Sequence, residues 1–338
     1  MTLHVMQMLI SQWRWLIPLL LWSADAHAWG LYTHVYFAQM LLWAVPLTDA
    51  RYRRAIKNFP QLVLAGACLP DLALLSQRPW GEPFSTTHQW QRARKLLDDA
   101  KSDEEYALSL GFASHLLVDV IAHNHFVPAH ERMWGNIPLL THAACEWAMD
   151  MHIRPHLFAQ PATLMRTHRT ALADYVATHF ECPYSLAIRG VDVLASAESL
   201  LRTSQLSHLC YYAASRFDTR MQRRFNYYLS ETGTRLAHID RILLGELPLW
   251  NPDPQADDPA LRQRIELMTP SQLRHRIPLP LDVFSVPYFP RNVGCQCRDL
   301  CGSPIHRAMV IIDAPSPDES GSHTPQPTHH PAGYSKSK

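Results

Sequence analysis

The stretch GFASHLLVDVIAHNHFVP, residues 111–128, decides how this chain of 338 residues is interpreted. It contains three ionisable side chains, His115, Asp119 and His123, each four residues from the next. Residues four apart share one face of an α-helix, so these side chains would form a row with one helical turn between neighbours. The positions between them are apolar, which predicts a buried helix, and buried ionisable groups are costly unless something pairs with them. The pattern favours a metal ion as that partner, although hydrogen bonds among the three groups would also satisfy them.

Helical periodicity extends on both sides of this stretch, from residue 33 to about residue 246. No long run alternates with the period of two that a strand would show. The sequence therefore predicts an all-α fold, a multi-helix bundle. Helices are expected near residues 33–45, 49–58, 88–99, 103–125, 138–158, 161–179, 186–202 and 205–245.

The composition is that of a globular protein with little overall charge. Hydrophobic residues make up 47% of the chain, charged residues 18%, and the formal net charge is +1. Such a balance argues against an extended nucleic-acid track. The 20 histidines are the unusual feature, and several stand at helical spacing beside carboxylates, which again points to metal.

Residues 1–28 have the pattern of a secretory signal peptide. The apolar run WLIPLLLW at 15–22 is shorter than the roughly 20 residues of a membrane span, and AHA at 26–28 fits a signal peptidase site. Cleavage there would leave Trp29 first, and its free α-amine and carbonyl oxygen could together chelate a cation. The mature chain is then expected to be secreted or periplasmic. An uncleaved N-terminal anchor is the alternative.

The chain changes character after residue 248, where proline and aspartate become frequent. Three of the seven cysteines, Cys295, Cys297 and Cys301, form a C-x-C-x-x-x-C cluster that is unlike the common zinc spacings and favours a local disulfide. The expected organisation is a signal peptide at 1–28, a helical domain at 29–250, a Pro- and Cys-containing extension at 251–312 and a disordered tail at 313–338.

Further candidate ligands lie outside the central stretch. His142 and Glu146, in THAACEWAMD, repeat the spacing of four on an apolar helix. Asp71 follows a proline inside the apolar run LVLAGACLPDLALL, where a helix cap and a metal ligand are equally plausible roles. His34 follows Trp29 by five residues, close enough for the imidazole and the terminal amine to reach one ion. His88, in FSTTHQW, stands at the start of a helical pattern and alone indicates little.

Taken in chain order, these residues resemble the zinc-dependent phospholipase C family. The order is an N-terminal Trp, His, Asp, His, then H-x-x-x-D, a further His and H-x-x-x-E, and it covers roughly residues 29–151. The segment AGACLPD resembles the family's small-residue stretch ending in Pro-Asp. The related fungal zinc nucleases, which cleave single-stranded nucleic acid, share the ligand order. The resemblance implies a helical bundle around a trinuclear zinc site.

The resemblance also implies how the ligands are shared among three Zn2+ ions, with Asp119 bridging two of them. One zinc is expected to bind Asp71, His88, His115 and Asp119. Another is expected to bind Trp29 (amine and carbonyl), His34 and Asp119. The third is expected to bind His142, Glu146 and one histidine from the segment just after Asp119.

The histidine that follows Asp119 in this set is either His123 or His125. The family places it six residues after the aspartate and directly after a proline, which corresponds to His125, but this chain lacks the proline. A continuous helix puts His123 on the face of Asp119 and points His125 away, unless the helix breaks at Asn124. Geometry favours the first residue and family spacing the second.

Such a site predicts a phospholipase C-like phosphodiester hydrolase. Clustered zinc ions can ionise a bound water near neutral pH for attack on phosphorus, and by resemblance Asp71 would be the general base. Asp150, one turn after Glu146, is a candidate for orienting a ligand histidine. The expected substrate is a phospholipid or another phosphodiester, with peripheral membrane contact. The alternatives are a nuclease or nucleotidase, for which Trp80 and Trp134 could stack bases, and a non-catalytic zinc-stabilised envelope protein.

Overall fold

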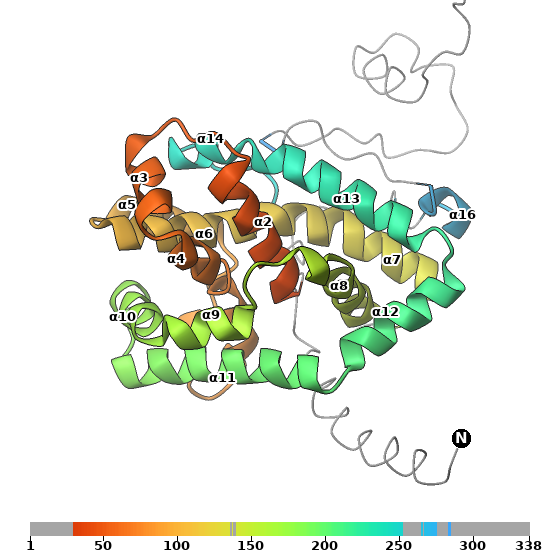
Figure 1. Cartoon of the computed structure of the whole chain (residues 1–338), viewed down its shortest axis with the longest axis horizontal. Coiled ribbons are helices and arrows are strands. Elements are labelled where there is room, and N and C mark those ends of the chain that lie inside the picture. The colour runs from red at the N-terminus through yellow and green to blue at the C-terminus, as the bar shows by residue number, and fades with distance from the viewer. Residues whose placement is uncertain are drawn as a thin grey trace, which may run out of the picture. The chain divides into compact units, whose positions relative to one another are not determined.

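The fold is built from helices in this computed structural model, which describes residues 30–135, 137, 140–252, 265, 267–275 and 283–284. No strand occurs among the described residues, so the prediction of an all-α fold is confirmed (Figure 1). The signal peptide predicted at 1–28, Trp29, the cysteine cluster at 295–301 and the tail at 313–338 lie outside the described residues. The domain boundaries predicted at 250 and 312 remain predictions.

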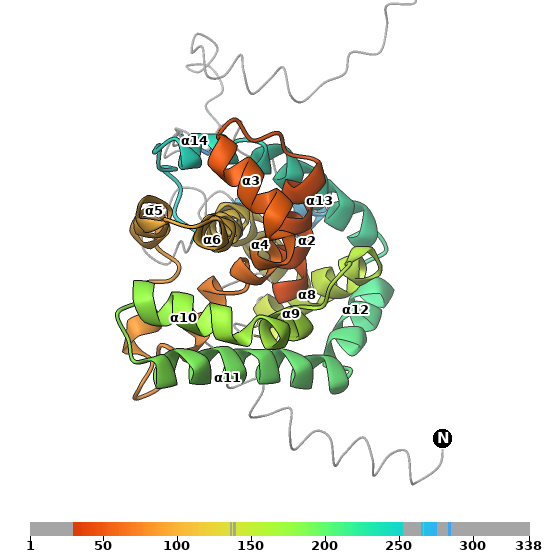
Figure 2. The same cartoon turned by 60° about the vertical axis from the view of Figure 1, so that its left-hand side comes forward.

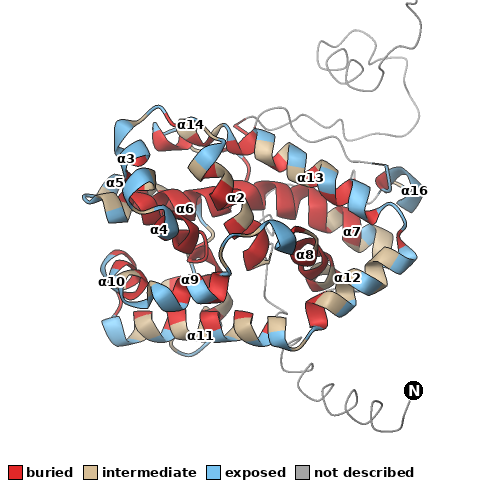
Figure 3. Cartoon of the chain, viewed as in Figure 1, coloured by how far each residue is buried: buried red, intermediate tan, exposed pale blue. Residues whose placement is uncertain are grey.

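A central helix, α6 (Asp103–Ile121), carries the decisive stretch through the core. It starts at a capping box, in which the Ser102 hydroxyl accepts from the Glu105 amide and the Glu105 carboxylate accepts from the Ser102 amide. Every residue from Tyr106 to Ile121 is buried (Figure 3). The Asp103–Trp134 stretch is long and apolar enough to cross a membrane, but its most apolar part is entirely buried inside the fold, as in the core helix of a soluble protein.

The chain does not leave the helical path at the end of α6. One wide π turn, η4 (Ala122–Phe126), leads directly into α7 (Val127–Trp134). Pro128 lies in the first turn of α7, where its missing amide hydrogen is tolerated, so it does not end the helix. Gly135, at a φ of 110°, terminates α7 in the left-handed conformation that glycine adopts freely.

The other early helices pack around α6, and two glycines allow one of them an unusually close approach. A Cβ on Gly66 would lie 2.4 Å from the carbonyl oxygen of Leu108, and a Cβ on Gly111 would lie 2.1 Å from that of Val63. Backbone therefore meets backbone where α4 crosses α6. The helices in contact with α6 include α2 (Leu31–Trp43), α3 (Ala50–Asn58), α4 (Pro60–Gly66), α5 (Trp90–Asp99) and α13 (Met221–Leu236).

The remaining helices enclose this arrangement. Helices α9, α10 and α11 pack against one another along one edge of the bundle (Figure 2). Helix α8 packs against α7 and α12. Their bounds are α8 (Leu140–Ile153), α9 (Pro161–Thr167), α10 (Arg169–His179), α11 (Tyr184–Thr203), α12 (Leu206–Phe217), α14 (Ile239–Leu243) and α16 (Pro270–Leu273), with 3-10 turns η2 (Pro70–Leu75), η3 (Glu82–Phe84) and η5 (Arg154–His156).

The long helix predicted at 205–245 is wrong, because the chain breaks into α12, α13 and α14. The first break lies at Asp218, whose carboxylate accepts from the Arg220 amide at 3.2 Å and pairs with the buried guanidinium of Arg224. An aspartate that bonds its own neighbouring backbone competes with the helix ladder. The helix predicted at 161–179 is likewise divided at His168, and the short α4 was not predicted.

Candidate metal centre

The predicted ligand side chains converge around the second half of α6. His115 and Asp119 come from α6, His34 from α2, Asp71 from η2 and His88 from the residues just before α5. Three groups result, and within each the potential ligand atoms all lie within 4.8 Å of one another. The groups are His34, His115 and Asp119; Asp71, His88 and His115; and His123, His142 and Glu146.

Asp119 lies at the centre of the cluster. Its Oδ1 is 3.3 Å from Nε2 of His34 and 3.6 Å from Nε2 of His123. Its Oδ2 is 2.9 Å from Nε2 of His115 and 3.4 Å from Nε2 of His88. Burial opposes ionisation of this carboxyl, but the neighbouring His115 and His34 outweigh that effect and hold its pKa well below the usual range. One carboxylate thus faces histidines from all three groups.

His115 is held in a single orientation by the backbone. Its Nδ1 lies 2.7 Å from the carbonyl oxygen of Ala67, and its ring stacks on that of His34 with centroids 3.5 Å apart. A carbonyl oxygen can only accept, so Nδ1 carries the proton and the Nε2 lone pair faces the cluster. Burial, with the neighbouring His34, lowers the pKa of His115, which favours the neutral imidazole that binds metals.

Asp71 does not cap a helix. The 3-10 turn η2 has no side-chain cap, and Asp71 lies in its first turn with Oδ1 3.8 Å from Nε2 of His115 and 3.9 Å from Nε2 of His88. Burial raises the pKa of Asp71 to about 7, against the opposing effect of the two histidines. Of the two roles that the sequence allowed, the cap is therefore absent and the carboxylate faces the cluster.

Helix α8 supplies a second row of ligand atoms. Nε2 of His142 lies 3.0 Å from Oε1 of Glu146, and Nδ1 of His142 lies 3.3 Å from Oε1 of Glu131 on α7. Burial opposes protonation of His142, but the two carboxylates outweigh it and raise its pKa to about 10. Sequence reasoning missed Glu131, because nothing in its neighbours marks a residue whose role depends on α7 packing against α8.

The π turn separates the two candidate histidines. His123 lies in the group with His142, their ring centroids 5.8 Å apart, whereas His125 belongs to none of the three groups and its ring lies 5.7 Å from that of Trp250. The helix does not break at Asn124 but widens there, and the side-chain Nδ2 of Asn124 donates to the carbonyl of Val120 at 2.9 Å. π turns of this kind often occur at functional sites.

The hydrogen bonding of the buried polar atoms in the cluster indicates that a metal ion would fit there. Both ring nitrogens of His34, Oδ1 of Asp71, both carboxylate oxygens of Asp119 and Oε1 of Glu146 are buried without a well-formed hydrogen bond to another described group. Buried groups in that state are costly. Imidazole and carboxylate donors that converge in this way match the ligand preferences of zinc.

Comparison with known families agrees with this geometry. A family model described as zinc-dependent phospholipase C matches residues 33–233, which include every described residue of the three groups. The chain belongs to the zinc-dependent phospholipase C family. The resemblance seen in the sequence is thereby confirmed, and the match extends past the last ligand candidate into α13. Comparisons with curated proteins and with solved structures gave no match.

The structure changes two expectations about residues near the cluster, the orienting role of Asp150 and the base-stacking role of Trp80 and Trp134. Asp150 makes its hydrogen bonds to Thr33 and Arg202, not to a ligand histidine. The indole nitrogen of Trp134 donates to Asp218 at 3.2 Å, and the ring of Trp80 is covered by the guanidinium of Arg189 at 4.5 Å. Both tryptophans are engaged in packing, which weakens their proposed role as base-stacking platforms.

Proposed function

We propose that this chain hydrolyses phospholipids as a phosphodiesterase that depends on three zinc ions. The observation that carries the proposal is the position of Asp119, one buried carboxylate with histidine nitrogens of all three groups within 3.6 Å. A carboxylate can place one oxygen towards each of two cations, so this residue suits a bridging role.

The ligand sets follow from which atoms are available. Nδ1 of His115 is occupied by the carbonyl of Ala67, so its Nε2 can serve only one ion. We assign that ion to Asp71, His88, His115 and Asp119. A second would bind His34, Asp119 and, after processing, the amine and carbonyl of Trp29. The third would bind His123, His142 and Glu146.

Zinc in such a site supplies Lewis acidity towards phosphoryl oxygens and a water that ionises near neutral pH. The chain supplies the positions and a proton acceptor. Asp71 turns Oδ1 towards His88 and His115, which leaves Oδ2 to hold a proton during attack on phosphorus. The carboxylate form of Asp71, which a zinc ion bound through Oδ1 would favour, is the form that can accept this proton.

Substrate would enter beside two histidines. The side chains of His88 and His142 are 11% and 14% exposed, whereas those of His34, His115 and Asp119 are fully buried. Solvent therefore reaches the cluster at His88, just before α5, and at His142 on α8. A lipid head group that reaches these two side chains would meet the ligands while its acyl chains stay outside.

Export belongs to the same proposal, since only a processed chain offers the amine of Trp29. The test is to express the full chain in a secreting host, sequence the mature N-terminus and measure its zinc content. Phosphatidylcholine vesicles and a single-stranded oligonucleotide are then offered in parallel, with and without chelator. We expect an N-terminal Trp, three zinc ions, and chelator-sensitive release of a phosphorylated head group.

Other outcomes would separate the alternatives. Cleavage of the oligonucleotide but not of the vesicles would replace the lipid substrate with nucleic acid. Full zinc loading without hydrolysis of either substrate would favour the non-catalytic, zinc-stabilised role. Retention of residues 1–28 in the mature protein would remove the Trp29 ligand from the proposal.

A further inference from the structure

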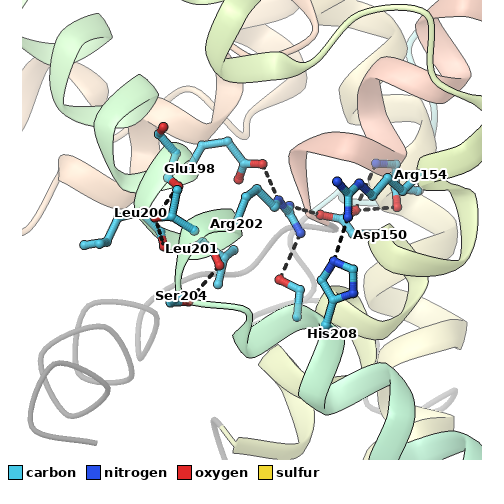
Figure 4. A network of polar contacts seen from close by, with 12 residues as sticks. Asp150, Arg154, Glu198, Leu200, Leu201, Arg202, Ser204 and His208 are labelled. Atoms are coloured by element: carbon cyan, nitrogen blue, oxygen red, sulfur yellow. Dashed lines mark hydrogen bonds and ion pairs between the residues drawn. The ribbon is translucent and has the colours of Figure 1, made fainter. Parts of the chain in front are cut away.

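The carboxylate of Asp150 joins α8 to the first turn of α2. Asp150 is fully buried, and its Oδ1 accepts from the amide of Thr33 at 3.0 Å and from the hydroxyl of the same residue at 2.8 Å. Its Oδ2 pairs with the guanidinium of Arg202 (Figure 4). The first amides of a helix have no partner within the helix, and a carboxylate there also meets the positive end of the helix dipole.

Arg202 is itself held on several sides. Its Nε donates to Glu198 at 2.6 Å, its Nη1 donates to Ser207 at 3.0 Å, and its guanidinium lies 4.0 Å from the ring centre of Tyr32. The side chain is only 15% exposed. An arginine bonded in this way cannot move to a second position without leaving buried carboxylates unpaired, so it fixes Asp150 in turn.

The contact determines how α2 is rotated about its axis. Thr33 is bound through both its backbone and its side chain, and the next residue is His34, whose Nε2 lies 3.3 Å from Asp119. Rotating α2 by a fraction of a turn would break both bonds to Asp150 and would move His34 off the ring of His115, on which it stacks.

The same carboxylate fixes the path by which the chain enters α2. A Cβ on Gly30 would lie 2.0 Å from Oδ2 of Asp150, so only glycine lets the backbone pass there. The carbonyl of Gly30 accepts from the amide of Thr33 at 2.9 Å. Gly30 directly follows Trp29, the residue whose amine the proposed second zinc requires.

We infer that Asp150, braced by Arg202, is the positioning residue for one zinc of the three, the ion assigned to His34, Asp119 and the processed N-terminus. Among the described residues, its hydrogen bonds go to Thr33 and Arg202 and not to a ligand side chain. Its effect passes through Thr33 and Gly30 to the rotation of α2 and to the start of the mature chain. This inference rests on the proposed function, because it concerns the occupancy of the site described there.

The test uses the processed, full-length protein and measures zinc retained after dialysis against graded chelator. Thr33→Val removes the hydroxyl bond to Asp150 without changing the size of the side chain, and Thr33→Ser keeps that bond. Gly30→Ala displaces the same carboxylate by a different route. Loss of an outer contact of this kind typically weakens metal binding roughly 10- to 100-fold. We expect Thr33→Val and Gly30→Ala to weaken the binding of one zinc of three by that amount, and Thr33→Ser to retain the wild-type affinity for all three.

Asp218→Asn provides the matched control, since it breaks another buried carboxylate–arginine pair, that of Asp218 and Arg224. We expect it to lower the melting temperature and leave all three zinc ions in place. The inference is overturned if Thr33→Val retains three zinc ions at wild-type affinity, or if all three weaken together in proportion to lost stability. A processed wild-type protein that binds no zinc overturns the proposed function itself, a result that the variants alone cannot produce.

Discussion

Nδ1 of His115 lies 2.7 Å from the carbonyl oxygen of Ala67, which is 48 residues earlier in the chain. This hydrogen bond spans the crossing of α4 and α6, where Gly66 and Gly111 let the two backbones meet. The orientation of a proposed zinc ligand therefore depends on two residues that have no side chain.

Replacing Gly111 with Ala tests that dependence. The added Cβ would lie 2.1 Å from the Val63 carbonyl oxygen and 2.8 Å from the Ala67 amide nitrogen, so α4 must move away from α6. Overpacking of this kind costs about 1–3 kcal/mol, and the displaced Ala67 carbonyl should also weaken zinc binding. Urea denaturation and zinc titration measure the two effects. Gly233→Ala is the control, because its Cβ meets only the flexible end of Met40, at 2.9 Å, and it should change neither quantity appreciably.

Asp119→Asn should remove two zinc ions at once. The amide keeps the shape of the side chain but loses the charge and one acceptor oxygen that a bridge between two cations requires. Zinc content should fall from three to one per chain, and hydrolysis of vesicles should be lost. Asp192→Asn, at an exposed ion pair with Arg169, should keep all three. Loss of a single zinc from the Asp119 variant would assign this residue to one ion and contradict the bridge.

The sequence was sufficient for the part of the site that one helix encodes. The spacing of His115, Asp119 and His123 needs only the period of α6 and the following turn, and the structure places all three in the cluster. His142 and Glu146 follow the same rule on α8. The resemblance to the family then grouped the remaining candidates, His34, Asp71 and His88, which no local pattern could bring together.

What the sequence could not provide depends on packing between distant segments. The contact of Glu131 with His142 exists only because α7 packs against α8, and the bond from Ala67 to His115 only because two glycines meet. The π turn was also beyond prediction, since a segment of five residues is too short for the apolar pattern to distinguish a π turn from an α-helix. Asp150 could be placed one turn beyond Glu146 but not paired with Thr33, which lies 117 residues away.

Paired replacements should decide between the two histidines of the π turn. His123→Gln should release the zinc assigned to His142 and Glu146, since a ring nitrogen of His123 lies within 4.8 Å of the ligand atoms of both residues. His125→Gln should retain three zinc ions, because the ring lies beside Trp250 and outside the group. Metal analysis after dialysis measures both variants. The opposite pattern would show that the ligand follows the family spacing and that the turn rearranges when zinc binds.

A final prediction concerns His130, a buried residue that the sequence did not single out. Its Nδ1 donates to the carbonyl of Phe126 at 2.7 Å, and its ring packs on Phe225. Burial, together with the charge of Arg224, lowers the pKa of His130 to about 3 from the ordinary value of 6.5. As the pH falls below 6.5, the unfolded chain takes up a proton that the folded chain refuses until about pH 3. The stability that His130 contributes is therefore fully present above the first value and is lost on the way to the second.

Between pH 6.5 and about pH 3, the free energy of unfolding falls through His130 by at most about 1.4 kcal/mol per pH unit. His130→Gln cannot gain this charge, so its free energy of unfolding should fall less steeply between about pH 7 and pH 5 than that of the wild type. Urea denaturation in the presence of chelator measures both slopes, and the contributions of the cluster histidines, which both proteins share, cancel in the difference. His156→Gln, at an exposed position, should keep the wild-type slope. Equal slopes for the wild type and His130→Gln would mean that the buried imidazole takes up its proton without opening the fold.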